Sequence, residues 1–195
     1  TFSSNTYVGW GWKAGGTAAS NTDGSITSSV SAGEYMSICT WTGDGNSGAT
    51  IGHGLGKVPS MILVKRRNTD LGWTVYHEAL GTGSEMYLNM TQAVTSSNFW
   101  ITSPTTSVFS VSDSDYVNAS SDTYVGYAFA NLEGACKVGS YVANGNADGT
   151  FVYLGFRPAW IMIRNKADAG EHWEIWDSVR DPDNVVTQRL RASDN

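Results

Sequence analysis

The chain has 195 residues, of which 41% are hydrophobic and 15% charged, and its formal net charge is −6 at pH 7. Nucleic acids and anionic membranes select basic surfaces, so this acidic balance argues against both as main partners. No apolar stretch approaches the ~20 residues of a membrane-spanning helix, and the 12% of aromatic residues argues against a disordered chain.

The first predicted element is a strand at residues 6–12, where Val8, Trp10 and Trp12 alternate with Tyr or Gly. A similar pattern returns at residues 123–129. Alternation with a period of two places each set of side chains on one face of a strand. We therefore predict strands at both places.

Two continuous apolar runs, at residues 61–64 and 160–163, predict two further strands. Each run follows closely on a proline, Pro59 or Pro158, and proline is common at the entry of a strand. A strand that is apolar at every position is covered on both faces, or its outer face meets another domain or subunit. Helical periodicity is weak throughout, so we expect almost no helix.

Four sequence blocks occur twice in the same order, which is hard to reach by chance. The matched blocks are 6–16 and 123–134, 40–46 and 140–146, 57–67 and 156–166, and 73–80 and 173–180. The copies are 117 residues apart at Tyr7 and Tyr124 but 100 apart at Trp73 and Trp173, because residues 16–33 are partly an insertion.

The repeat divides the chain into three parts. Residues 1–33 hold the terminal strand of a preceding unit and a linker. Residues 34–134 form one complete unit. Residues 135–195 are the first part of a second, incomplete unit.

Turn signals separate the predicted strands. Asp44-Gly45 and Asn144-Gly145 lie at matched places and are preferred two-residue hairpin turns, because both central positions need a positive φ. Short strands with such turns between them predict an all-β fold of antiparallel β-sandwich or jelly-roll modules in tandem.

The incomplete unit lacks a counterpart of the strand at 123–129, which leaves an open strand edge and an open apolar face. Either residues 6–12 fill this gap, from the same chain or from a neighbouring copy, or the polypeptide continues beyond residue 195 and supplies the strand. We expect continuation, which a native mass far above 20.9 kDa would show.

The three histidines, His53, His77 and His172, have no second His or Cys at a metal-ligand spacing. We interpret them as isolated surface or half-buried imidazoles, with His53 in a flexible GHGLG turn that exposes it. The Asp-x-Asp pairs at 113–115 and 181–183 lack the distal Glu of a calcium loop, so we interpret them as solvated turns. No metal and no cofactor are predicted.

Aromatic residues are the class rich enough to suggest ligand binding, because their rings stack on the apolar faces of sugars and other ligands. Those at repeated positions are assigned mostly to structure: Trp10, Trp12, Trp73, Trp160 and Trp173. Trp100, in NFWITS, has no visible counterpart and is the candidate surface aromatic for ligand contact, with core packing as the alternative. No catalytic residue is predicted, because a GxSxG elbow and a P-loop lysine are both missing from the sequence. Cys39 and Cys136 either pair or are two small buried residues.

Seven stretches spread over residues 6–184 carry a resemblance to a known family: TYVGWGWKAGG, SNTDGSITSSVSAG, ATIGHGLGKVPSMILVK, PTTSVFSVS, DTYVGYAFANLEG, VGSYVANGNADGTFVYLGFRPAWIMIRNK and WDSVRDPDN. They are similar to a tandem-repeat domain of unknown function in structural proteins of tailed bacteriophages, especially phages of marine bacteria and cyanobacteria. Members of that family resemble tail-fibre, tail-appendage or other virion surface proteins. No catalytic residue is carried over.

The resemblance implies a non-catalytic virion structural protein, part of a tail fibre or tail appendage on the virion surface that contacts a host glycan or other receptor. The implied partners are other copies of the chain in a homo-oligomer such as a trimer, and other virion proteins. The alternatives are a capsid decoration or head-fibre protein, a polysaccharide-degrading depolymerase and a secreted bacterial adhesin. A depolymerase needs two carboxylates ~5–10 Å apart across a cleft, and the sequence nominates no such pair.

Overall fold

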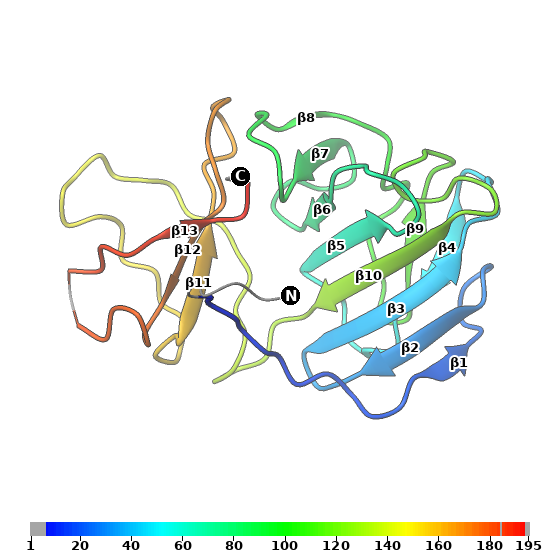
Figure 1. Cartoon of the computed structure of the whole chain (residues 1–195), viewed down its shortest axis with the longest axis horizontal. Coiled ribbons are helices and arrows are strands. Elements are labelled where there is room, and N and C mark those ends of the chain that lie inside the picture. Colours follow the sequence, from blue (N-terminus) through cyan, green and yellow to red (C-terminus); the bar gives the residue numbers. More distant parts are fainter. Residues whose placement is uncertain (1–6, 184, 194–195) are drawn as a thin grey trace.

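The computed structural model describes residues 7–183 and 185–193, and within these ranges it contains strands, turns and loops but no helix (Figure 1). The strands are β1 (Ala19–Asn21), β2 (Ser28–Ala32), β3 (Met36–Thr42), β4 (Ala49–Gly52), β5 (Met61–Arg66), β6 (Thr74–His77), β7 (Ser84–Tyr87), β8 (Thr95–Ser96), β9 (Val108–Val111), β10 (Thr123–Phe129), β11 (Trp160–Ile163), β12 (Glu174–Asp177) and β13 (Leu190–Arg191). The prediction of an all-β protein is confirmed, and no described segment is a helix that could cross a membrane.

The strands form three sheets. The largest has eight strands in the order β1-β2-β3-β10-β5-β6-β7-β8, the second pairs β4 with β9, and the third has the order β11-β12-β13. All of these pairings are antiparallel, as predicted. In Figure 1 the third sheet stands to one side of the large sheet, joined to it by long loops.

β10 is the central strand of the large sheet, between β3 and β5. Its alternate residues Tyr124, Gly126 and Ala128 face the core, as the period-two pattern requires. A Cβ at Gly126 would lie 3.0 Å from the Cys39 sulfur and 3.1 Å from the Trp41 ring, so a larger residue there requires these side chains to shift.

The main core lies between the inner face of the large sheet and the β4–β9 pair. Trp41 is at its centre, with its ring stacked on Tyr124 at 5.4 Å and edge-on to Phe109 at 5.7 Å. The Tyr124 hydroxyl donates to Asp115 O and accepts from Ala119 N, so its polar end is satisfied. This core fixes β3, β9 and β10 relative to one another.

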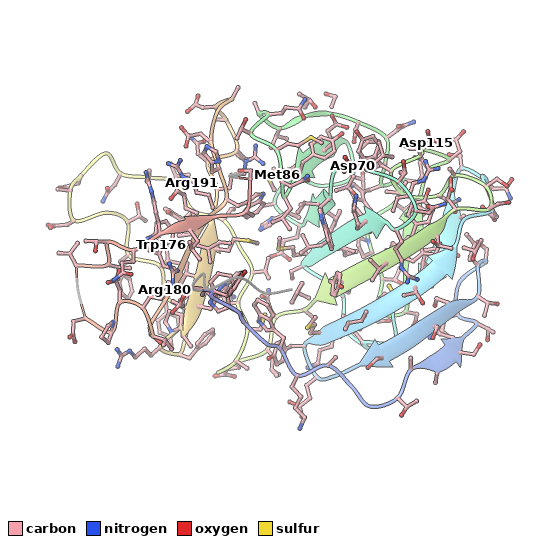
Figure 2. All side chains as sticks on the ribbon, viewed as in Figure 1. Asp70, Met86, Asp115, Trp176, Arg180 and Arg191 are labelled. Atoms are coloured by element: carbon pink, nitrogen blue, oxygen red, sulfur yellow. The ribbon has the colours of Figure 1, made fainter. Side chains whose placement is uncertain are left out.

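A second core covers the opposite face of β5–β7. Met61, Val75 and Met86 pack there against Met162 of β11 and against Trp173, which directly precedes β12. Met86 is labelled in Figure 2. The run at 61–64 is therefore apolar at every position because Ile62 and Val64 face the main core while Met61 and Leu63 face the second one. This confirms a strand covered on both faces for residues 61–64, whereas in the second run, 160–163, Ile161 is 36% exposed.

Side-chain hydrogen bonds to backbone carbonyls connect the third sheet to the large one. The Trp173 indole N–H donates to Tyr87 O at 2.9 Å. The Arg164 guanidinium donates to the carbonyls of Tyr87 at 2.6 Å and Met90 at 2.9 Å, and to that of Gln92. Burial lowers the pKa of Arg164, because the charged form loses water at this contact.

The third sheet has the same strand pairing as β5–β7. In β5–β6 Met61 pairs with His77, and in β11–β12 Trp160 pairs with Asp177. The three pairs that follow match one for one. The third strand also agrees, since Val75 pairs with Met86 in one sheet and Ile175 with Leu190 in the other. The proline before the first strand, the start of that strand and the tryptophan before the second strand thus occupy matching positions in the two sheets.

The loops after β3 and before β11 also share a local structure. Asn46 N donates to Asp44 Oδ1 at 2.9 Å, and Asn146 N donates to Asn144 Oδ1 at 3.0 Å. The glycines inside these turns, Gly45 and Gly145, have φ of 74° and 68°, which glycine adopts without strain. The prediction of two-residue hairpins is wrong, however, because β3 and β4 belong to different sheets.

Two further expectations need correction. Residues 16–33, expected to be an insertion and linker, supply β1 and β2 of the large sheet, because Ser and Thr alternating with Ile26, Ser28 and Val30 bury one face. The strand expected at 6–12 is not formed over residues 7–12, which lie in a loop. Thr6 lies outside the described residues.

Candidate functional site

Trp100 is a core residue, so the prediction of a surface aromatic for ligand contact is wrong. Its side chain is 2% exposed and packs edge-on against Tyr76 at 5.6 Å and near Phe109 at 6.3 Å. A bridge to Val111 of β9 fixes its backbone. Its lack of a counterpart elsewhere in the sequence says nothing about exposure, whereas the adjoining Phe99, also buried, is the signal of a core segment.

His53 is fully buried, which corrects the expectation of an exposed turn. Its Nε2 lies 3.2 Å from Thr105 O, and its Nδ1 accepts from Leu55 N at 3.2 Å. These contacts assign the neutral tautomer with the proton on Nε2. Burial lowers the pKa of His53, opposed in part by the Thr105 carbonyl and by the charge of Asp23.

This burial predicts acid-sensitive folding. His53 is neutral in the folded chain and regains an ordinary pKa near ~6.5 when unfolded, so the unfolded state binds more protons below that pH. The free energy of unfolding should therefore fall as pH drops from ~6.5 towards the folded-state pKa, by up to ~1.4 kcal/mol per pH unit. Urea titrations between pH 5 and 7 measure this slope.

The controls for this prediction use the two histidines whose pKa is lowered by burial, His53 and His77. His77 also has a lowered pKa from burial, and its Nδ1 accepts from Ala79 N, as Asp177 Oδ1 accepts from Val179 N. His77→Asn keeps a side-chain acceptor for the backbone N–H two residues on and removes the titration of His77. The slope of unfolding free energy against pH that remains then belongs to His53. A chain with both His53→Gln and His77→Asn that has the same slope as the His77→Asn chain would contradict the assignment.

The other polar side chains serve as structural supports. Arg66 pairs with Asp122 at 2.5 Å and with Asp115 at 3.8 Å. The guanidinium of Arg180 lowers the pKa of Asp177 to about 2.

In the described part of the chain, no group of three or more His, Cys, Asp or Glu residues could hold a metal ion, and Cys39 and Cys136 do not pair.

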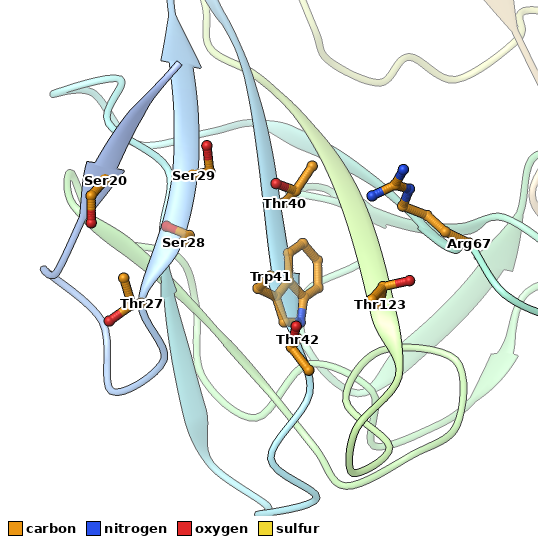
Figure 3. A pocket seen from close by; sticks show the side chains of 9 residues that line it. All are labelled: Ser20, Thr27, Ser28, Ser29, Thr40, Trp41, Thr42, Arg67 and Thr123. Atoms are coloured by element: carbon orange, nitrogen blue, oxygen red, sulfur yellow. The ribbon is translucent and has the colours of Figure 1, made fainter.

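A shallow, open hollow of about 350 Å³ lies on the large sheet at β1, β2, β3 and β10 (Figure 3). Its lining residues are Ser20, Thr27, Ser28, Ser29, Thr40, Trp41, Thr42, Arg67 and Thr123. The Ser28 hydroxyl donates to Gly52 O and so points into the core. The remaining hydroxyls and the exposed Arg67 side chain form the polar surface.

Strand register sets the spacing of these hydroxyls. Ser20 pairs with Ser29, and Ser29 pairs with Thr40, so three hydroxyl residues form one row across β1, β2 and β3. Thr42 pairs with Thr123 in the next row. Neighbouring strands lie ~4.8 Å apart, so the surface presents hydroxyls at regular intervals.

Arg67 is the cation of this hollow. Its backbone N–H donates to Thr123 O at 2.8 Å, which holds the residue at the end of β5 beside β10. Its side chain is exposed, and no carboxylate forms an ion pair with it over the described ranges. A hydroxyl-lined surface with one free guanidinium suits a hydroxylated ligand that carries a carboxylate or sulfate group.

Sequence reasoning missed this hollow because isolated Ser and Thr residues carry no recognisable motif. The available signal was the alternation of Thr40 and Thr42 with Cys39 and Trp41, which separates a polar face from a buried one. Only strand pairing shows that Ser29 and Thr123 share that face.

Comparison with known proteins gives one match. The family described as Domain of unknown function (DUF7483) matches residues 1–195. Searches of the curated proteins and of the solved structures each found no match. The chain therefore belongs to the DUF7483 family of domains of unknown function.

Proposed function

We propose that the chain is a structural module of a phage virion, part of a tail fibre or tail appendage that contacts the host surface without catalysing a reaction. The support from the sequence is the long resemblance to repeat domains of tailed-phage structural proteins. The support from the structure is one observation, the stacking of two sheets that share the same strand pairing, β5–β7 and β11–β13.

Matched registers favour a chain built from tandem modules of β-sandwich type. The first module contains the large sheet and the β4–β9 pair, and β11–β13 begin the second. Stacked modules joined by hydrogen bonds such as those of Arg164 and Trp173 extend in one direction, as an appendage requires.

Self-association in a homo-oligomer, such as a trimer, is part of the proposal. Large apolar side chains are exposed in the loop before β11, with Val142 at 86%, Phe151 at 88% and Tyr153 at 78%. Several large apolar side chains exposed in one loop favour contact with another chain.

The position of the chain on the particle tests the proposed function. Antibodies against the purified chain, with gold labels, should decorate the tail appendages of the phage that encodes it. Label on the capsid would instead favour a head-fibre or decoration protein. Particles that carry no label would overturn the proposal.

Host contact is proposed for the hydroxyl-lined hollow with Arg67. Arg67→Ala should weaken binding of the purified chain to host-cell polysaccharide at least ~10-fold, because a charge-assisted hydrogen bond to an acidic sugar is lost. Arg157→Ala removes another exposed arginine, near Pro182, and is the matched control. Equal affinity of both variants would exclude this hollow as the contact.

A further inference from the structure

The outer edge of β11 is an open strand edge. β5, the strand with the same pairing, has β6 on one side and β10 on the other. β11 pairs with β12 alone, and its second edge has no strand partner among the described residues. An unpaired edge presents a row of free backbone N–H and C=O groups to any strand of suitable sequence.

Residues 7–13 have the sequence of such a strand. Tyr7-Val8-Gly9-Trp10-Gly11-Trp12 corresponds to the β10 run from Tyr124 to Phe129, position by position. In the large sheet Phe129 pairs with Met61 and Tyr127 with Leu63. Carried over to the third sheet, this register places Trp12 opposite Trp160, Gly11 opposite Ile161 and Trp10 opposite Met162.

The structure already brings the two tryptophans to that sheet. The Trp12 ring lies edge-on to the Trp160 ring, with centroids 5.2 Å apart. The Trp10 indole N–H donates to Asp177 Oδ2 at 3.2 Å, and the Arg180 guanidinium lies 5.9 Å from the Trp10 ring. In Figure 1 the beginning of this segment lies at β11, from where the chain runs towards β1 and β2, and Figure 2 labels Arg180 near that beginning.

The same segment is tethered within reach. Ser31 Oγ donates to Gly16 O at 2.8 Å, and a Cβ on Gly15 would lie 2.2 Å from Ala32 O, so residues 15–16 lie flat against the end of β2. A short tether gives the segment a high effective concentration at β11. This favours the segment of the same chain over that of a second copy.

We infer that residues 7–13 add to the open edge of β11 as an antiparallel strand, in the register Trp12–Trp160, and close the third sheet with the first segment of the same chain. Strand addition gives strand partners to the backbone groups along the open edge of β11. It also buries part of the side chains of Tyr7, Val8 and Trp12, which are now 61%, 48% and 42% exposed. The N-terminal segment and the last sheet thereby become one folding unit.

Disulfide trapping in the full chain tests the register. Gly11→Cys with Ile161→Cys, in a Cys136→Ser background, places two thiols at directly opposed positions. Gly9→Cys with Ile161→Cys, two residues out of register, is the matched control. We expect mild oxidation to give a cross-linked monomer at least ~10-fold faster for the first pair. Equal rates overturn the register, and a cross-linked dimer in dilute solution overturns the assignment to the same chain.

Hydrogen exchange tests the strand itself without cross-linking. Backbone N–H groups of successive strand residues point to opposite edges of the strand. Val8→Pro with Gly11→Pro therefore removes one N–H from each edge of this segment, so one of the two lost N–H groups belongs to the edge beside β11. We expect exchange of the β11 amides to accelerate at least ~10-fold, while the amides of β3 and β10 stay unchanged as the folding control. Unchanged exchange in β11 overturns strand addition.

Discussion

Replacing Trp100 with alanine should lower the free energy of unfolding by about 3–5 kcal/mol, the usual cost of removing a buried Trp ring. The ring is 2% exposed and fills the main core between Tyr76 and Phe109, so its loss leaves a cavity that the surrounding strands cannot close. Urea denaturation measures the change.

Two further variants make this result decisive. Trp100→Phe keeps part of the ring volume and should lose less stability than Trp100→Ala. Phe151→Ala removes an aromatic ring that is 88% exposed and should stay within about 0.5 kcal/mol of the original chain. A Trp100→Ala chain as stable as the Phe151→Ala chain would contradict the buried position.

Removing Trp173 should release the third sheet while the large sheet stays folded. Trp173 is 5% exposed, packs against Met61, Val75 and Met86, and donates to Tyr87 O. Trp173→Ala should cost about 3–5 kcal/mol of stability in this sheet, because Trp173 is the largest buried side chain of the second core. Limited proteolysis should then cut within residues 135–193 first.

The conservative variant separates ring packing from the hydrogen bond. Trp173→Phe keeps most of the apolar contact and loses the N–H bond to Tyr87 O, so about 1–3 kcal/mol is expected. Simultaneous cleavage in the large sheet and the third sheet of Trp173→Ala would show that the two cores unfold as one.

The local patterns in the sequence determined much of this fold. Alternation of Val125, Tyr127 and Phe129 with smaller residues specified a strand but not which face lies in the main core, and the apolar run at 61–64 specified a strand covered on both faces. Both follow from the two-residue period of a strand, which any stretch of sequence displays by itself. The correspondence of Trp73 with Trp173 likewise follows from the sequence.

Long-range pairing was not determined locally. β10 joins β3 and β5 across many intervening residues, and β4 pairs with β9 and not with β3. The sequence near Asp44-Gly45 favours a turn, but it does not state whether the strands on either side pair with each other. That choice depends on which distant strand completes each face.

Exposure was decided by tertiary structure alone. His53 and Trp100 stand in polar or Gly-rich surroundings in the sequence, yet β9 and the segments beside it cover both. Ser29, Thr40 and Thr123 share one surface because three separate strands align in register. A single strand fixes which side chains share its own face, whereas burial and shared surfaces arise from contacts between strands that the local sequence does not encode.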